Sequence, residues 1–337
     1  MFFIAAGSLF SFSSGSCCIA FHSTLEERQK DIVRLILDSL SGYEYEIKLP
    51  FSISPDEAET IVDHVLTDYP ELFYVGDEYY YTQTGESAPV SAITFTPRMP
   101  RRQAERIWKQ MMSRTAPLLS SLEGKSDYQK ARLVHDWLAE NVSYSLDSTS
   151  DYTPYGAILR GKAACEGYAE AYTLLLRQLG VSASVVGGTG VTADGSEAHA
   201  WNIVRINDEY VLVDVTWDDE EESDRISHIY FALNDELMGR DHIPQGSWAR
   251  LPASTSLMYS SHEQLGLSVD SSTDFYLLLR RVMLAKEGSI RFDSAQTMER
   301  FMDELDSHSS RYIREYGDPE CTVYPDYIQL ACSFIYP

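Results

Sequence analysis

The stretch Gly161-Lys162-Ala163-Ala164-Cys165-Glu166-Gly167-Tyr168-Ala169 decides how the middle of this chain is expected to fold. Apolar residues follow it at helical spacing, which predicts a helix that begins at or near Cys165. A thiol in the first turn lies beside unpaired backbone amides and the positive end of the helix dipole, and both stabilise a thiolate. The same amides could hold an oxyanion. Taken alone, the segment suits a buried structural cysteine equally well. The predicted apolar side of the helix consists of Tyr168, Tyr172, Leu175, Leu176 and Leu179, with Gly180 in the position that ends the helix.

The segments that follow the helix are predicted to be strands. Ser182–Val186 is expected to be a short strand, followed by a glycine-rich loop. His199–Ile206 and Tyr210–Trp217 are rich in β-formers, and Asn207-Asp208 between them is typical of a tight turn. The two segments are therefore predicted to form a β-hairpin.

The register of this hairpin decides which side chains meet. With a two-residue turn, Ile206 pairs with Glu209, and Asp214 then lies opposite Trp201. Side chains alternate along a strand, so His199 lies on the same face as Trp201. His199 and Asp214 become diagonal neighbours with Cβ atoms about 7–8 Å apart. A slip of one residue at the turn would separate them.

These residues have the chemistry of a nucleophilic triad. An acid bonded to one ring nitrogen of a histidine fixes its tautomer and leaves the other nitrogen to take a thiol proton. The chain order Cys165, His199, Asp214 is the order used by papain-type enzymes. We therefore predict Cys165 as nucleophile, His199 as base and Asp214 as the orienting acid.

The region from about Ser126 to Pro244 resembles the transglutaminase-like superfamily, and its bacterial members in particular. The resemblance covers about a third of the chain, and it implies an α+β, papain-like core. In this core a helix that bears Cys165 packs on an antiparallel sheet that bears His199 and Asp214. The matching segments are His135-Asp136-Trp137-Leu138, Tyr155-Gly156-Ala157, Cys165-Glu166-Gly167-Tyr168-Ala169, Glu197-Ala198-His199-Ala200-Trp201-Asn202, Leu212-Val213-Asp214-Val215-Thr216-Trp217-Asp218, Tyr230-Phe231 and Asp241-His242-Ile243-Pro244, with Tyr69-Pro70-Glu71-Leu72-Phe73 similar to the N-terminal region.

The activity expected from this resemblance is acyl transfer on a peptide or protein amide through a thioester. Water as acceptor gives a protease or amidase, and a lysine-like amine gives a cross-linking transglutaminase. A third alternative is a peptide- or wall-binding module without turnover, but the intact triad favours an enzyme. Tyr155 is predicted as a second oxyanion donor. Glu166 and Trp201 are predicted to line the cleft, although Glu166 also suits a first helical turn and Trp201 also suits a core.

Charge disfavours a nucleic-acid partner. The chain has 27 basic and 51 acidic residues, a net charge of −24, which repels phosphate backbones. Gly188–Ala193 nominally matches a dinucleotide fingerprint, but a strand rather than a helix follows it, so a mobile loop beside the cleft is expected. Asp218–Asp224 lacks metal-loop spacing and is expected to be a solvated acidic loop. His228 and His242 lack partners at metal spacing, so both are expected to be structural, and no metal or cofactor is predicted.

The cysteines and the first residues bear on the compartment. None of the five cysteines forms a CxxC pair, while Cys321 and Cys332 could bridge in an oxidising compartment. Met1–Phe21 has no charged side chain and resembles an export signal without its basic start. A leader would place the protein outside the cytoplasm or at the cell envelope. A wrongly assigned start or a disordered tail would leave it cytoplasmic. The oligomeric state stays open.

Four regions are expected. They are a leader or tail at 1–21, an N-terminal α+β accessory region at 22–120, the transglutaminase-like core at 121–250 and a C-terminal α/β accessory region at 251–337. Helix starts are predicted at Thr24-Leu25-Glu26-Glu27, Ser54-Pro55-Asp56-Glu57 and Ser126-Asp127-Tyr128-Gln129. In the tail, helices and strands are expected to alternate and to end with a strand at Tyr327–Tyr336.

Overall fold

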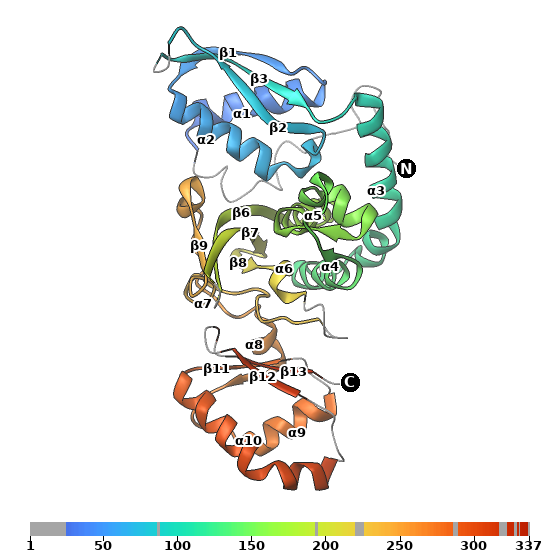
Figure 1. The fold of residues 1–337 in the computed structure, drawn as a ribbon, viewed down its shortest axis with the longest axis vertical. Coiled ribbons are helices and arrows are strands. Elements are labelled where there is room, and N and C mark those ends of the chain that lie inside the picture. Colours follow the sequence, from blue (N-terminus) through green and yellow to red (C-terminus); the bar gives the residue numbers. More distant parts are fainter. Residues whose placement is uncertain are drawn as a thin grey trace.

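The structure is a computed structural model that describes residues 25–85, 88–192, 195–219, 226–285, 289–316, 322–326, 329 and 331–335. The fold is α+β, as predicted, and three groups of helices and strands follow one another along the long axis of the molecule (Figure 1). The boundaries of the four expected regions stay predictions. The leader segment 1–21 and Cys321 lie outside the described residues.

The N-terminal group is a three-stranded antiparallel sheet with two helices against it (Figure 1). The strand order is β1-β3-β2, so the last strand in the sequence is central. The elements are α1 (Glu27–Ser41), β1 (Glu46–Ile53), α2 (Pro55–Asp68), β2 (Val75–Thr82) and β3 (Val90–Pro97).

Two of the predicted helix starts are confirmed. Ser54 and Ser126 precede α2 and α4 (Asp127–Asn141), and each side-chain oxygen accepts a hydrogen bond from the amide three residues further on. α1 begins at Glu27, while Thr24, the predicted cap, lies outside the described residues. Cap chemistry therefore located two of these helices to the residue.

The central group carries the Cys165 helix, α5 (Cys165–Gln178), packed on a four-stranded antiparallel sheet of order β8-β7-β6-β9 (Figure 1). Residues of β7 divide between the two faces of this sheet. Ala200 and Asn202 meet α5, whereas Trp201 and Ile203 pack in the apolar cluster on the other face. The strands are β6 (Ser182–Thr192), β7 (Gly195–Ile206), β8 (Glu209–Val213) and β9 (His242–Pro244).

The predicted hairpin register is confirmed at its turn, but the second strand is shorter than expected. Ile206 pairs with Glu209, and the last pair of the ladder joins Asn202 to Val213. The chain then forms a short helix, α6 (Val215–Asp218), where a strand to Trp217 was predicted. The prediction was wrong there because the Asp214 side chain caps this helix and ends the strand.

The glycine-rich segment is not the loop that was expected, because β6 continues through it to Thr192. Its glycines allow two indole rings to lie against the strand. A Cβ at Gly188 would come within 2.6 Å of the Trp201 ring, and one at Gly190 within 2.8 Å of the Trp217 ring. The motif therefore serves aromatic packing.

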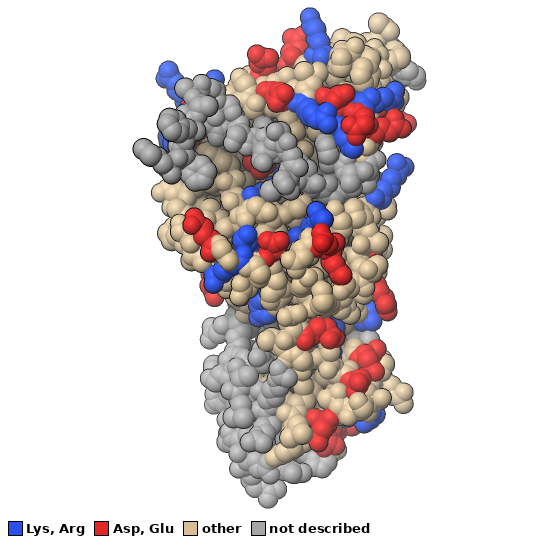
Figure 2. Space-filling model, turned by 180° about the vertical axis from the view of Figure 1, so that it is seen from behind, with Lys and Arg blue, Asp and Glu red and all other residues tan. Residues whose placement is uncertain are grey.

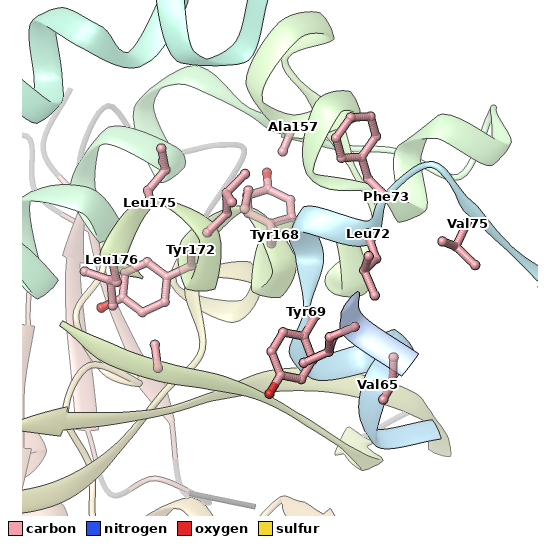
Figure 3. Close-up of a cluster of buried hydrophobic side chains, with 14 of the residues drawn as sticks. Val65, Tyr69, Leu72, Phe73, Val75, Ala157, Tyr168, Tyr172, Leu175 and Leu176 are labelled. Atoms are coloured by element: carbon pink, nitrogen blue, oxygen red, sulfur yellow. The ribbon is translucent and has the colours of Figure 1, made fainter. Parts of the chain in front are cut away.

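One apolar core joins the N-terminal and central groups. Side chains from α2 and the turn that follows it, such as Val65, Tyr69 and Leu72, lie beside Tyr168 and Tyr172 of α5 (Figure 3). The predicted apolar side of α5 is confirmed, with Leu179 only partly buried. On α4, Ala131, Val134 and Leu138 are buried, whereas Trp137 is partly buried and Leu133 is exposed.

The C-terminal group has a core of its own beneath a four-stranded sheet of order β10-β11-β13-β12 (Figure 1). It meets the central group through Ala331, which packs in the apolar cluster that contains Trp201. The elements are β10 (Ser268–Val269), α9 (Phe275–Ala285), β11 (Ser289–Phe292), α10 (Ala295–Tyr316), β12 (Thr322–Asp326) and β13 (Ala331–Ile335). β13 lies within the final strand predicted at Tyr327–Tyr336, of which residues 327, 328, 330 and 336 lie outside the described residues.

The surface mixes the two signs of charge. On the face drawn in Figure 2, basic and acidic side chains of the described residues alternate, and the basic ones form no continuous patch. Among the described residues, no helix is long and apolar enough to cross a membrane.

Candidate active site

Cys165 is the first residue of α5, as predicted, so its backbone amide belongs to the helix end that lacks intrahelical acceptors. Its side chain is half-buried against Ala169, Val185 and Ala200. Burial on one side and access on the other allow a substrate carbonyl to reach the sulfur. The positive end of a helix of this length favours an anion at this position.

His199 lies on β7 between its two predicted partners. Its Nε2 is 2.7 Å from Asp214 Oδ2, and Cys165 lies close enough to the ring to help raise its pKa. Nδ1 is therefore the ring nitrogen left for the thiol. Burial disfavours the imidazolium, but the Asp214 carboxylate and Cys165 outweigh it and raise the pKa of His199 to about 10. The side chain is only 6% exposed, which keeps water from screening these interactions.

Asp214 is held from both of its carboxylate oxygens. Oδ1 accepts the backbone N–H of Thr216 at 2.8 Å and that of Trp217 at 3.3 Å, while Oδ2 faces His199. Burial favours the neutral acid, but His199 and His242 outweigh it and hold the pKa of Asp214 well below its usual range. The backbone hydrogen bonds by which Asp214 caps α6 therefore also fix the carboxylate that orients His199.

His242 is a member of this cluster that the sequence analysis treated as structural only. Its Nε2 lies 3.0 Å from Asp214 Oδ2, and its Nδ1 lies 2.6 Å from Asp241 Oδ1. β9 pairs with β6 so that His242 lies opposite Gly190. Metal spacing was the wrong criterion for this histidine. The adjacent Asp241-His242 pair, within a segment that resembled the family, was the signal available.

Two indole rings enclose His199. Trp201 stacks on it with ring centroids 6.1 Å apart, and Trp217 stacks with centroids 4.9 Å apart. Trp201 is 1% exposed, so it belongs to the packed wall behind the histidine rather than to an open cleft surface. This apolar enclosure strengthens the electrostatic interactions among His199, Asp214 and His242.

Tyr155 and Tyr144 lie in different surroundings. The ring of Tyr155, the predicted oxyanion donor, packs edge-on against Phe73 with centroids 5.9 Å apart. Tyr144, which the sequence analysis did not single out, lies near enough to Cys165 and Glu197 that burial and these neighbours raise its pKa. Tyr144 belongs to β4 (Ser143–Tyr144), which pairs with β5 (Lys162–Ala163) just before the cysteine.

Glu166 directly follows Cys165 in the first turn of α5. Desolvation and nearby Asp77, opposed by Arg98, raise the pKa of Glu166 to about 7. Glu170, one turn along α5, is buried, and burial together with Glu166 raises its pKa well above the ordinary value. The start of the helix thus carries two acids that titrate above their usual range.

A second histidine–carboxylate network lies behind α5. His135 on α4 is fully buried, with Nε2 3.1 Å from Asp218 and Nδ1 3.1 Å from Asp136, which also bonds His228 at 2.7 Å. Burial opposes the charged ring, but the two carboxylates raise the pKa of His135 to about 9. The expected solvated acidic loop is therefore wrong for Asp218, which is buried, while residues 220–225 lie outside the described residues.

Two groups of side chains in the described part of the chain have ligand types that suit a metal ion. Their ligand atoms lie within 4.8 Å of one another in each group. In both groups the histidine nitrogens already face carboxylate oxygens at hydrogen-bond distance. The geometry is therefore that of hydrogen-bonded ion pairs. The groups are His135, Asp136 and His228, and His199, Asp214 and His242.

Comparison with known proteins places this site in a family. Residues 118–215 match the family model of the transglutaminase-like superfamily, a stretch that includes Cys165, His199 and Asp214. This central part of the chain belongs to that superfamily.

Two curated proteins and a solved structure are also similar to this chain. The mouse (Mus musculus) protein kyphoscoliosis peptidase is 25% identical over 175 residues, which are 46% of this chain and 26% of that protein. Human (Homo sapiens) kyphoscoliosis peptidase is 25% identical over 156 residues, 40% of this chain and 24% of that protein. The match thus spans about a quarter of the length of these curated relatives. The crystal structure of the periplasmic domain of TgpA from Pseudomonas aeruginosa shares 19% identity at a TM-score of 0.25, over 42% of this chain and 63% of that one.

Proposed function

We propose that this protein is a cysteine-dependent acyl-transfer enzyme that acts on peptide or protein amides. The observation that carries the proposal is the hydrogen bond between Asp214 and His199 beside Cys165, whose sulfur lies at the start of a helix. Each group has the position its role requires: nucleophile, base and orienting acid. Similarity over 175 residues to a protein named a peptidase supports the proposal.

The first half of the reaction forms a thioester. His199 takes the Cys165 proton through Nδ1, while Asp214 holds Nε2–H and stabilises the imidazolium. The thiolate attacks the amide carbonyl, and the Cys165 backbone N–H donates to the oxyanion. His199 then returns its proton to the leaving amine, the C–N bond breaks, and the acyl group stays on sulfur.

In the second half an acceptor replaces the sulfur. Water, deprotonated by His199, attacks the thioester and releases a carboxylic acid with regeneration of the thiol. We favour hydrolysis because the curated relatives are peptidases. An amine acceptor would form a new amide by the same steps, so transamidation is the second candidate.

The test measures both fates of the thioester in one mixture. Purified protein is incubated with a glutamine-rich protein and a fluorescent primary amine, and cleavage products and amine incorporation are followed by mass spectrometry. We expect cleavage that Cys165→Ala and His199→Ala abolish. Incorporation of the amine without cleavage would favour the transglutaminase.

Cys332→Ala is the matched control, because Cys332 is a buried cysteine of the C-terminal core. It should retain cleavage activity. If cleavage or incorporation is equal in wild type and Cys165→Ala across a broad peptide library, the enzyme proposal fails.

A further inference from the structure

A second buried histidine, His242, shares the carboxylate of Asp214 with His199. His242 and His199 both place Nε2 against Oδ2, at 3.0 Å and 2.7 Å. The two rings come from strands at different positions in one sheet, β9 and β7, and their centroids are 5.3 Å apart. The His242 side chain is 1% exposed, so it is shielded from solvent.

The hydrogen-bond pattern fixes the charge of His242. Its two ring nitrogens face two carboxylates, Asp214 and Asp241, and a carboxylate can only accept. Both nitrogens must therefore donate, which makes His242 an imidazolium. Burial opposes this charge, but the two carboxylates outweigh it and raise the pKa of His242.

The groups around His242 extend the network away from Cys165. The phenol of Tyr230 donates to Asp241 Oδ2 at 2.9 Å, and Gln329 Nε2 donates to the same oxygen at 2.7 Å. Trp217 and Trp201 cover the His242 ring, with centroids 4.4 Å and 5.0 Å away. The titratable groups that face the ring are thus Asp214, Asp241, His199 and Tyr230.

We propose that His242 is a positioning residue for the Cys165–His199–Asp214 triad, an imidazolium that fixes Asp214 and tempers its negative charge. The inference rests on the proposed function, because it assigns a role within the same site. His242 bonds the Asp214 carboxylate, which in turn bonds His199, so it acts through Asp214.

The charge of His242 determines the direction in which the pH–rate profile should move when it is removed. Without the His242 cation, Asp214 and Asp241 would leave the site more negative. A more negative site holds protons more tightly, so both the thiolate–imidazolium pair and its deprotonated form would appear at higher pH. Loss of the cation should therefore move both limbs of the pH–rate profile upward, whereas a purely structural role would lower the rate without moving the limbs.

The experiment compares wild type with His242→Gln, which keeps an N–H donor but removes the charge. The readouts are the iodoacetamide alkylation rate of Cys165 and kcat/KM for a cleaved peptide, each from pH 4 to about pH 11.5, so that both limbs are covered. We expect both limbs to move up by about 1 pH unit. His228→Gln is the matched control, because His228 also bonds an aspartate but lies outside this network, and its profile should match wild type.

The outcomes separate the two proposals. If wild type shows no Cys165-dependent activity, the proposed function fails. If wild type is active and the profile of a folded His242→Gln overlays it, the positioning role is overturned. Should His242→Gln not fold, the ring ¹⁵N shifts of His242 in the wild-type protein decide: two protonated nitrogens at pH 7 support the proposal, and a neutral ring contradicts it.

Discussion

At the scale of single residues, Asp214 concentrates the chemistry of the site. Each of its oxygens accepts two hydrogen bonds, from backbone amides on one side and from His199 and His242 on the other. A carboxylate saturated in this way cannot rotate without losing bonds in a buried environment. The orientation of His199 towards Cys165 follows from that restraint.

Tyr144 offers a prediction at the same scale. It is 42% exposed beside Cys165, so its ring is available to a substrate side chain. Tyr144→Ala should lower kcat/KM about fivefold, chiefly through KM, because an aromatic contact contributes about 1 kcal/mol. Tyr80→Ala on β2, also an exposed tyrosine, is the control and should leave kinetics unchanged. Unchanged kinetics in Tyr144→Ala would show that this residue does not contact the substrate.

At the scale of elements, α5 combines a nucleophile with an unfavourably placed acid. Glu170 is buried in the middle of the helix, one turn after Glu166. Its neutral form is favoured in the folded protein, while the unfolded chain releases the proton at ordinary acidic pH. Folding stability should therefore fall as pH rises above the unfolded value, until Glu170 ionises in the folded state as well.

Glu170→Gln tests this linkage. In wild type, Glu170 binds a proton in the folded state that it releases in the unfolded state, and glutamine has no such proton. The Tm of the variant relative to wild type should therefore rise from pH 5 to pH 8. Thermal unfolding at both pH values measures it. Glu140→Gln, at an exposed position on α4, should show no such growth. An advantage equal at both pH values would mean that the acid is not protonated in the folded protein.

The strand β6 carries another prediction at this scale. A Cβ at Gly190 would lie 2.8 Å from the Trp217 ring and 3.2 Å from the Cβ of His199. Gly190→Ala should therefore displace these rings, lower stability by about 1–3 kcal/mol and reduce activity. The control is Gly85→Ala, where nothing lies within 4 Å. Stability is measured by denaturant unfolding and activity by peptide cleavage. A Gly190→Ala variant that matches the control in both measurements would contradict the prediction.

Several elements of the fold could be predicted from the sequence. Caps located α2 and α4, helical spacing located α5, and turn chemistry set the register that joins Ile206 to Glu209. These signals are local, and they were sufficient to bring His199 and Asp214 together. The return of β9 to β6, which brings in His242, depends on pairing between distant segments, and no local pattern encodes it.

At the scale of the whole molecule, the C-terminal group reaches the network behind the site. Gln329 is fully buried and donates to Asp241, while Arg291 of β11 donates to Gln329 and to the Ile229 carbonyl. Gln329 was not predicted because its importance arises only from the packing of one group on another. Buried bonds of this kind couple the stability of the two groups.

Gln329→Ala measures this coupling. Loss of the donor leaves Asp241 with one fewer partner, so stability should fall by about 1–3 kcal/mol. Activity should fall as well, because Asp241 holds His242. Gln103→Ala at an exposed position on α3 (Arg101–Leu122) is the control. If both variants unfold at the wild-type denaturant midpoint, the C-terminal group does not support the network.

The central claim is that Cys165 is an activated nucleophile, and its alkylation tests this most directly. Native protein is treated with limiting iodoacetamide near neutral pH, and labelling of Cys165 is followed by mass spectrometry with a short unstructured cysteine peptide in the same tube. We predict that Cys165 is labelled at least tenfold faster than the peptide, and that His199→Ala removes this advantage. Labelling of Cys165 no faster than the peptide, or unaffected by His199→Ala, would contradict the account.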